Sequence, residues 1–156
     1  MPKTNAMRML TSAKIPFEVI TYEVDESDLS GVHIAESVGL PMDMVFKTLV
    51  AKGDKTGYLV FCIPVHKEIN LKTAAALTGN KKIEMVAVKD LLSLTGYIRG
   101  GCSPVGMKKK FPTYFDVCVT AHQKITVSGG ARGIQLLLDK DDLINFVGGV
   151  VIDVAE

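Results

Sequence analysis

Hydrophobic residues recur along the chain with two spacings, which separate predicted helices from predicted strands. Within residues 4–14, Ala6, Met9, Leu10 and Ala13 lie three or four positions apart, as on one face of a helix. Runs of β-branched and aromatic residues elsewhere predict strands. The expected helices cover residues 4–14, 31–39, 69–79, 89–96 and 139–148. The expected strands cover residues 17–24, 44–54, 58–65 and 82–88, two segments within 124–139, and a last strand or tail at 150–154.

Several of these helices are bounded by residues that satisfy free backbone groups. Thr4 or Asn5 can cap the first helix and Ser30 the second. Asp139, or an aspartate just after it, can cap the last helix. Gly79 stands where the third helix should end in a left-handed residue. These signals fix the expected helix ends more closely than periodicity alone.

The order of the elements indicates the fold class. About seven or eight strands and four or five helices are expected, and they do not alternate strictly, so a doubly wound parallel sheet is not favoured. "GDKTG" at residues 53–57 should join two strands into a hairpin, and residues 97–120 should be strand pieces joined by turns. We therefore predict an α/β (mixed α+β) fold with a curved, barrel-like mixed sheet surrounded by helices. Without a visible repeat or linker, residues 1–156 should form a single domain.

Composition narrows the possible partners. The chain is 47% hydrophobic and 22% charged, enough for a proper core, and its net charge of +1 gives no global field for nucleic acid. Any RNA contact would therefore come from a local patch or a helper protein. No apolar run approaches the ~20 residues of a membrane span, and three cysteines are too few for a disulfide framework. We expect a cytoplasmic protein with no membrane or DNA partner.

Lys47 does not fit its surroundings. It interrupts an apolar run from Met44 to Ala51 that otherwise has the composition of a buried strand. An ammonium group that leaves water without a partner loses several kcal/mol of solvation, roughly. Lys47 is therefore either a ligand-binding residue in a partly desolvated pocket or a side chain that reaches solvent from an edge strand.

Two glycine-rich segments offer a site for such a ligand. They are "RGGCSPVG" at residues 99–106 and "VSGGARG" at residues 127–133. Glycine lets a ligand approach the main chain closely. Ser128 adds a hydroxyl group and Arg132 a fixed positive charge, so with Lys47 the set suits a small polar or anionic ligand. The alternative is that the glycines only form hairpins and bulges.

Other candidate motifs are weaker. Cys62 and His66 are four residues apart but have no second pair at a metal-binding spacing, and G-x-G-x-x-G is absent, so we expect neither a metal nor a cofactor. Cys102 is the only plausible nucleophile, but a small apolar filler is the favoured interpretation. Lys108–Lys110 is either a solvated turn or a phosphate contact, and the turn is favoured.

At these residues the chain resembles the YbaK/EbsC family, bacterial aminoacyl-tRNA deacylases related to the editing domain of many bacterial prolyl-tRNA synthetases. The FKT lysine, the GGxSPxG segment and the SGGxRG segment are specific as a set, and the likeness runs nearly end to end. The segments that carry the resemblance are "TNAMRMLTSAKIPFEVITYE", "VFKTLVA", "TGYIRGGCSPVGMKKKFPTYFD" and "ITVSGGARGIQLLL".

The resemblance implies positions for a substrate pocket on a curved mixed α/β fold. Lys47 is the implied catalytic residue, and Gly101 is a stronger assignment than Gly100. Gln135 stands where some relatives carry aspartate, and Ser30 where some carry a bulkier residue. The expected substrate-binding residues are Tyr22, Gly100, Gly101, Ser128 and, from the constellation above, Arg132.

The resemblance also implies an activity: removal of cysteine from Cys-tRNA(Pro), and from cysteinyl-tRNA more broadly. The substrate thiol would attack its own ester and form a cyclic thioester, without an enzyme nucleophile or a metal. Lys47 would contact a phosphate, the ribose or the ester. The implied partners are the 3′ end of aminoacylated tRNA and prolyl-tRNA synthetase. The alternatives are an Ala-tRNA(Pro) deacylase and a non-catalytic tRNA- or synthetase-binding module.

Overall fold

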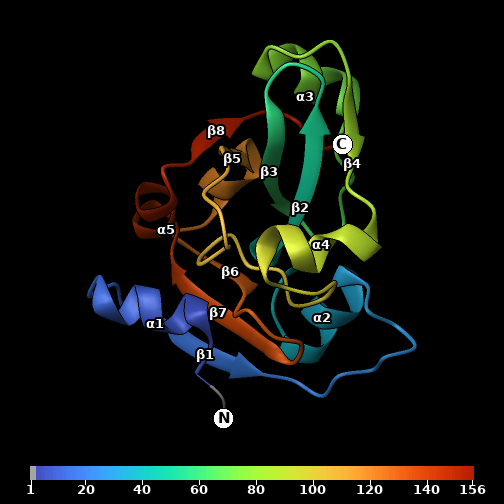
Figure 1. Cartoon of the computed structure of the whole chain (residues 1–156). Coiled ribbons are helices and arrows are strands. Elements are labelled where there is room, and N and C mark those ends of the chain that lie inside the picture. Colours follow the sequence, from blue (N-terminus) through green and yellow to red (C-terminus); the bar gives the residue numbers. More distant parts are fainter. Residues whose placement is uncertain (1–2) are drawn as a thin grey trace.

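The computed structural model describes residues 3–156, and within them the chain forms five α-helices, eight strands and two short 3-10 helices (Figure 1). The helices are α1 (Asn5–Ser12), α2 (Gly31–Val38), α3 (Leu71–Thr78), α4 (Val88–Thr95) and α5 (Lys140–Val147), with 3-10 turns η1 (Met42–Met44) and η2 (Val117–Ala121). The strands are β1 (Glu18–Thr21), β2 (Phe46–Gly53), β3 (Gly57–Pro64), β4 (Ile83–Met85), β5 (Thr113–Asp116), β6 (Lys124–Ser128), β7 (Ile134–Asp139) and β8 (Val150–Ile152).

The strands form two sheets that continue into one another. The smaller sheet has the order β1-β7-β6 and is antiparallel throughout. The larger sheet has the order β4-β2-β3-β5-β8, with antiparallel pairs around β2 and parallel pairs on either side of β5. A parallel bridge between Val45 and Thr126 joins the start of β2 to β6. The prediction of a mixed α/β fold with a barrel-like sheet core is therefore confirmed.

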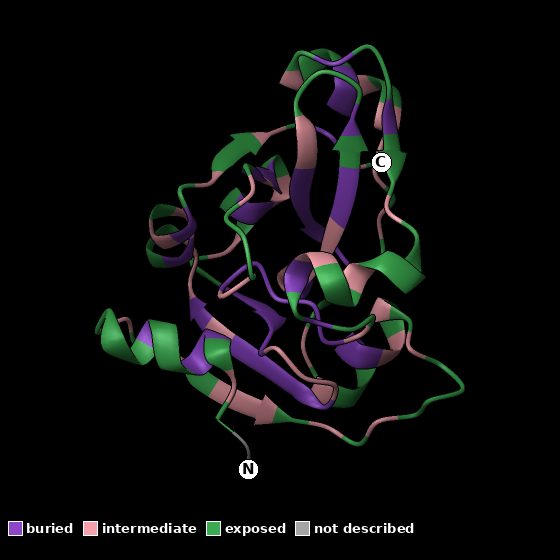
Figure 2. Cartoon of the chain, in the orientation of Figure 1, coloured by how far each residue is buried: buried purple, intermediate pink, exposed green. Residues whose placement is uncertain are grey.

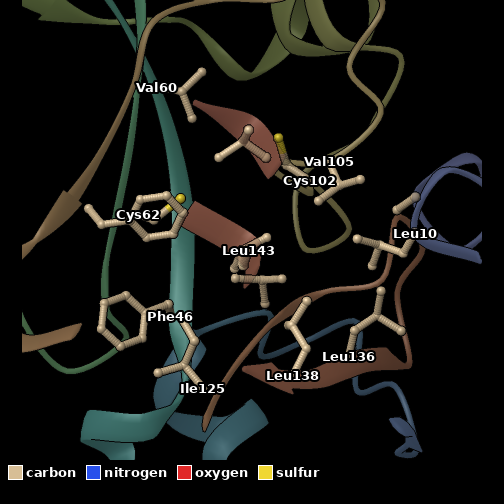
Figure 3. Packing of buried hydrophobic residues seen from close by; sticks show 14 of the residues in the cluster. Leu10, Phe46, Val60, Cys62, Cys102, Val105, Ile125, Leu136, Leu138 and Leu143 are labelled. Atoms are coloured by element: carbon tan, nitrogen blue, oxygen red, sulfur yellow. The ribbon is translucent and has the colours of Figure 1, made fainter. Parts of the chain in front are cut away.

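The main core lies where the inner faces of these sheets meet α1 and α5. Phe46, Cys62, Leu136 and Leu138 pack there, and α1 contributes Leu10 (Figure 3). A second cluster lies where α3 covers the other face of the β2–β3 hairpin. Strand β3 is thus covered on both faces, which explains why its sequence is almost continuously apolar (Figure 2).

Most of the predicted helix caps are present. The Thr4 hydroxyl accepts a hydrogen bond from the Met7 amide at 3.2 Å, and the Ser30 hydroxyl caps α2 in the same way. Asp139 caps α5, and Gly79 follows α3 in the left-handed conformation. Because each cap satisfies amide groups that have no partner inside the helix, these ends could be located from local chemistry.

The predicted strand pieces in residues 97–112 are wrong. That segment is irregular, and the first strand after it is β5. Its polar groups find partners nearby instead of in a ladder: the Tyr97 hydroxyl donates to the Val105 carbonyl at 2.7 Å, and the Lys108 amide donates to the Thr95 carbonyl at 3.0 Å. Two prolines in the segment have no amide hydrogen to give a sheet.

The start of α1 fastens both glycine-rich segments. The Thr4 hydroxyl donates to the Gly129 carbonyl, and the Asn5 side-chain amide donates to the Gly106 carbonyl at 2.8 Å. The first helix therefore holds two loops that are far from it in the sequence. Across residues 3–156, no helix has the length and apolar character needed to cross a bilayer.

Candidate functional site

A cavity of about 460 Å³ opens beside the start of β2. The residues before and at the start of β2 form one wall, α2 a second, and the loop at residues 99–102 a third. The ends of β6 and β7 contribute the floor. The apolar lining includes Leu29, Val32, Ile34, Val45, Phe46, Leu49 and Val65. The polar lining includes Ser30, Lys47, Thr48, His66, Glu68, Arg99, Ser128 and Gln135.

Lys47 lies in the wall of this cavity and is neither fully buried nor free in solvent. Its side chain is 25% exposed, and its Nζ atom lies 3.7 Å from Oε1 of Glu68, whose side chain is 82% exposed. Such a long and solvated ion pair contributes about 0.2–1 kcal/mol to stability at most. An ammonium group has three donors, so Lys47 can bind an anionic or carbonyl oxygen beside this contact.

The two glycine-rich segments pack main chain against main chain at the cavity edge. Gly100 lines the cavity with φ +86°, and Arg132 Nε donates to the Arg99 carbonyl at 2.8 Å beside it. A Cβ atom added to Gly101 would lie 3.0 Å from backbone atoms of Ala131 and Arg132. Gly101 therefore supports the wall from behind, while Gly100 forms its surface.

The amide groups of this segment differ in their availability. The Gly101 amide already donates to the Ile98 carbonyl at 2.9 Å. Within residues 3–156, the Gly100 amide donates to no other protein group. A backbone N–H that lines a partly desolvated cavity can stabilise negative charge that develops on a ligand oxygen. Gly100 is therefore the better candidate for an oxyanion donor.

The floor of the cavity comes from a cross-strand pair at the ends of β6 and β7. Ser128 lies opposite Gln135, and both are buried. Ser128 Oγ accepts from the Gly130 amide at 3.2 Å, which fixes the loop that follows. Gln135 Oε1 accepts from the Thr126 hydroxyl at 3.1 Å. Because Gln135 is a neutral amide, neither residue places a carboxylate on this floor.

The cysteine thiols near the cavity are not activated. Cys102 lines the cavity but is only 7% exposed, and burial raises its pKa to about 11. Cys62 lies behind Thr48, and burial raises its pKa to about 12. A thiol with a pKa near 11 is ionised in only about one molecule in 10⁴ at pH 7, and the thiolate is the nucleophile. Both cysteines pack in the main core cluster.

The structure places the other sequence-derived residues around this cavity. Tyr22 and Arg132 line a much smaller hollow next to it, which shares Gly100 with the cavity. Cys62 is buried and His66 is exposed. In the described part of the chain, no group of three or more histidine, cysteine, aspartate or glutamate side chains is placed to hold a metal ion.

Sequence reasoning did not identify His66, Glu68 and Arg99 as cavity residues. All three lie outside helices and strands, where a charged or polar residue has no unusual pattern. Glu68 lies 21 positions beyond Lys47, and only the path of the chain after β3 brings the two side chains together. The sequence offered two indirect signals: Arg99 begins a glycine-rich segment proposed as a ligand site, and the spacing of Cys62 and His66 suggests a metal rather than a cavity.

With this geometry in place, comparison with known proteins identifies the family. The family described as "Aminoacyl-tRNA editing domain" matches residues 30–146, and the chain belongs to this family. A protein of Enterococcus faecalis named "Putative Cys-tRNA(Pro)/Cys-tRNA(Cys) deacylase EbsC" is 46% identical over 147 residues, which are 94% of this chain and 90% of that protein. The family relationship predicted from the glycine-rich segments and Lys47 is thereby confirmed.

More distant relatives extend the comparison. Proline–tRNA ligase of Staphylococcus aureus is 27% identical over 104 residues, which are 67% of this chain and 18% of the ligase. A crystal structure described as "a putative trans-editing enzyme for prolyl tRNA synthetase" has a TM-score of 0.84 at 22% identity and covers 100% of this chain and 99% of that one. At that identity the structural match establishes a common fold.

Proposed function

We propose that the protein is an aminoacyl-tRNA deacylase that clears cysteine from Cys-tRNA(Pro), and also acts on Cys-tRNA(Cys). Membership of the editing family and the name of the 46% identical relative support this substrate class. The observation that carries the proposal is the content of the cavity. It brings Lys47 and Gly100 together, whereas burial raises the pKa of the thiol of Cys102, the cysteine in its lining, to about 11. Such a site suits a substrate that brings its own nucleophile.

In the proposed reaction the sulfur of the cysteinyl group attacks the carbonyl carbon of its own ester. A C–S bond forms, the C–O bond to the terminal ribose breaks, and the thiol proton ends on the ribose oxygen. The products are a cyclic thioester and free tRNA, and water later opens the thioester. An attack within one molecule that is held in a reactive geometry can lower the barrier by roughly 7 kcal/mol or more.

The protein's part in this reaction is to bind and orient. The Gly100 amide donates to the carbonyl oxygen as negative charge develops there. Lys47 holds the terminal adenosine through a phosphate or ribose oxygen, or offsets charge at the ester. The apolar wall, which includes Val45 and Phe46, excludes water from the reacting atoms. A cavity of about 460 Å³ lies within the usual range for small-molecule sites.

The proposed partner is prolyl-tRNA synthetase, and the proposed location is the cytoplasm. A net charge of +1 gives the chain little general affinity for RNA, so prolyl-tRNA synthetase would supply much of the tRNA binding. The protein would then act in the cytoplasm, where tRNA is charged. The 27% identity to a segment of a proline–tRNA ligase shows relationship to the synthetase and motivates this partner. Tight tRNA binding that does not change when synthetase is added would contradict it.

The test is a deacylation panel with Cys-, Ala- and Pro-charged tRNA(Pro). We expect the Cys ester to react fastest, and Lys47→Ala to lose at least about tenfold in rate, or ~1.4 kcal/mol of barrier. Lys52→Ala is the matched control, because Lys52 is an exposed lysine on the same strand and lies outside the cavity. It should react like the unchanged protein.

Other outcomes of the deacylation panel would contradict specific parts of the proposed function. An intact rate in Lys47→Ala would remove Lys47 from the mechanism. A Ser ester that reacts as fast as the Cys ester would exclude attack by the thiol. Preference for the Ala ester would make the protein an alanine deacylase, and binding without turnover of any ester would make it a binding module.

A further inference from the structure

Another hollow, of about 170 Å³, is lined by residues of α1 and α5. These two helices lie on the same side of the molecule (Figure 1). Residues 104–113 pass between these two helices and form its third wall. None of its lining residues lines the cavity that contains Lys47. We call it the basic groove, and its main side chains are Met9, Met107, Lys109, Lys110, Phe111 and Phe146.

The rim of the basic groove carries positive charge without acidic partners. Lys109 and Lys110 are exposed and line the groove, whereas the neighbouring Lys108 is exposed but packs beside Gly96. Arg8 lies in an adjoining hollow that shares Met9 with the groove. Among the ion pairs within residues 3–156, none involves any of these four cations. Neighbouring like charges repel each other, so a bound polyanion would relieve this arrangement. The concentration is local, because the whole chain has a net charge of only +1.

The backbone that presents these lysines is held in place. The Lys108 amide donates to the Thr95 carbonyl at 3.0 Å, and the Asn5 side chain donates to the Gly106 carbonyl at 2.8 Å. The lysines therefore project from an ordered loop. Less chain entropy is lost when an ordered loop binds than when a flexible tail does.

The floor of the groove is apolar and partly aromatic. Phe111 and Phe146 line it and are half-buried, so part of each side chain remains accessible. Grooves that combine lysines with accessible aromatic faces are typical of proteins that bind nucleic-acid strands, because phosphates meet the cations while sugars and bases meet the rings. A protein partner without acidic side chains would match the apolar floor alone and would leave the lysines unpaired.

We propose that the basic groove binds the phosphate backbone of the tRNA beyond the 3′ end that enters the cavity. Arg99, Gly100 and Cys102 line the cavity, and residues 104–107 and 109–111 line the groove. One continuous stretch of chain therefore contributes to both. The identification of the bound RNA as tRNA rests on the proposed function. The positive charge of the groove does not rest on that function, because it comes from the lysines that line the groove.

The test compares two double variants. Lys109→Ala/Lys110→Ala removes the lysines of the groove, and Lys81→Ala/Lys82→Ala removes another exposed consecutive pair that lines neither hollow. The binding of uncharged tRNA(Pro) is measured over a series of salt concentrations. We expect the slope of log Kd against log salt to become shallower by about 1.4–1.8 in the groove variant, which corresponds to two lost phosphate contacts. The control pair should keep the slope of the unchanged protein, and thermal denaturation verifies that both variants are folded.

A small ester, 3′-O-cysteinyl adenosine, separates this inference from the proposed function. The groove variant should hydrolyse it as fast as the unchanged protein does, while its KM for Cys-tRNA(Pro) rises. A salt slope equal to that of the control pair would overturn the inference, even if deacylation is confirmed. Loss of binding to prolyl-tRNA synthetase with unchanged binding to free tRNA would also overturn it, in favour of a protein surface. A shallower slope in a protein that hydrolyses no Cys ester would support the groove and reject the deacylase.

Discussion

Gly101→Ala is expected to damage the site by separating the two glycine-rich segments. Gly101 is not in the left-handed region, so the substitution carries no penalty from its own backbone conformation. The difficulty is steric, because the new methyl group would lie 3.0 Å from backbone atoms of Ala131 and Arg132. Backbone atoms cannot rotate away as the end of a side chain can, so one segment has to move by a few tenths of an ångström or more.

The size of the effect follows from this contact. Inserting a methyl group into a closely packed region costs about 1–3 kcal/mol. In a domain of this size each kcal/mol shifts the melting temperature by about 2–4 °C, so we expect a decrease of roughly 2–12 °C. The displaced segment also carries Gly100, whose amide we place at the substrate carbonyl. Deacylation should therefore fall by more than the loss of folded protein explains.

Gly57→Ala is a control with a similar stability cost and no effect on the site. Gly57 is the first residue of β3, directly after the β2–β3 turn, and has φ +80°, and nothing lies within 4 Å of an added Cβ atom. A left-handed alanine costs about 1–2 kcal/mol, so this variant should lose stability and keep its specific activity. The assay is thermal denaturation together with deacylation of Cys-tRNA(Pro) below the transition. If Gly101→Ala retains both stability and activity, the close approach of the segments is wrong.

Two further predictions concern buried groups. Cys102→Ala should keep its deacylation rate within about threefold, ~0.6 kcal/mol of barrier, because the proposed nucleophile is the thiol of the substrate, and loss of all activity would contradict this. Asp116 is 1% exposed and accepts hydrogen bonds from the amides of Cys118, Val154 and Ala155 at 2.8–3.0 Å. Burial, the largest influence, raises its pKa, but the hydrogen bonds from Cys118, Ala155 and Val154 together outweigh it and leave the pKa below the ordinary range. A lowered pKa gives stability that is present above about pH 4 and is lost as the pH falls through the folded-state value. Asp116→Asn should therefore lose about 1–3 kcal/mol at pH 7, and its deficit should narrow in acid; denaturant titrations at both pH values with a constant deficit would refute the argument.

The sequence predicted those parts of the fold that depend on local chemistry. The caps at Thr4, Ser30 and Asp139 act within three residues along the chain, and composition alone identifies the apolar strand β3. The failure over residues 97–112 has the opposite cause. Hydrogen bonds between loop groups and packing against distant residues hold that segment, and neither leaves a periodic pattern.

The candidate site also contains some residues that a local sequence pattern predicts and others that only the folded chain brings together. Lys47 was recognisable because a charge in an apolar strand violates a local rule, and the structure places it together with Gly100 and Ser128 on one cavity. Glu68 and Arg99 violate no such rule, since charged residues in loops are ordinary. Their positions depend on how β3 and the 99–102 loop are oriented in space, which residue identities alone do not specify.

The attachment of both glycine-rich segments to α1 has a consequence for the boundaries of the folding unit. The family match begins at residue 30, after α1 and β1, yet β1 forms one edge of the smaller sheet and pairs with β7. A fragment restricted to residues 30–146 would expose the open side of β7 and release the carbonyl groups that Thr4 and Asn5 hold. Local opening would then begin at the two glycine-rich segments beside the cavity. The segment that matches the family model is thus smaller than the segment that the hydrogen bonds and strand pairing hold together.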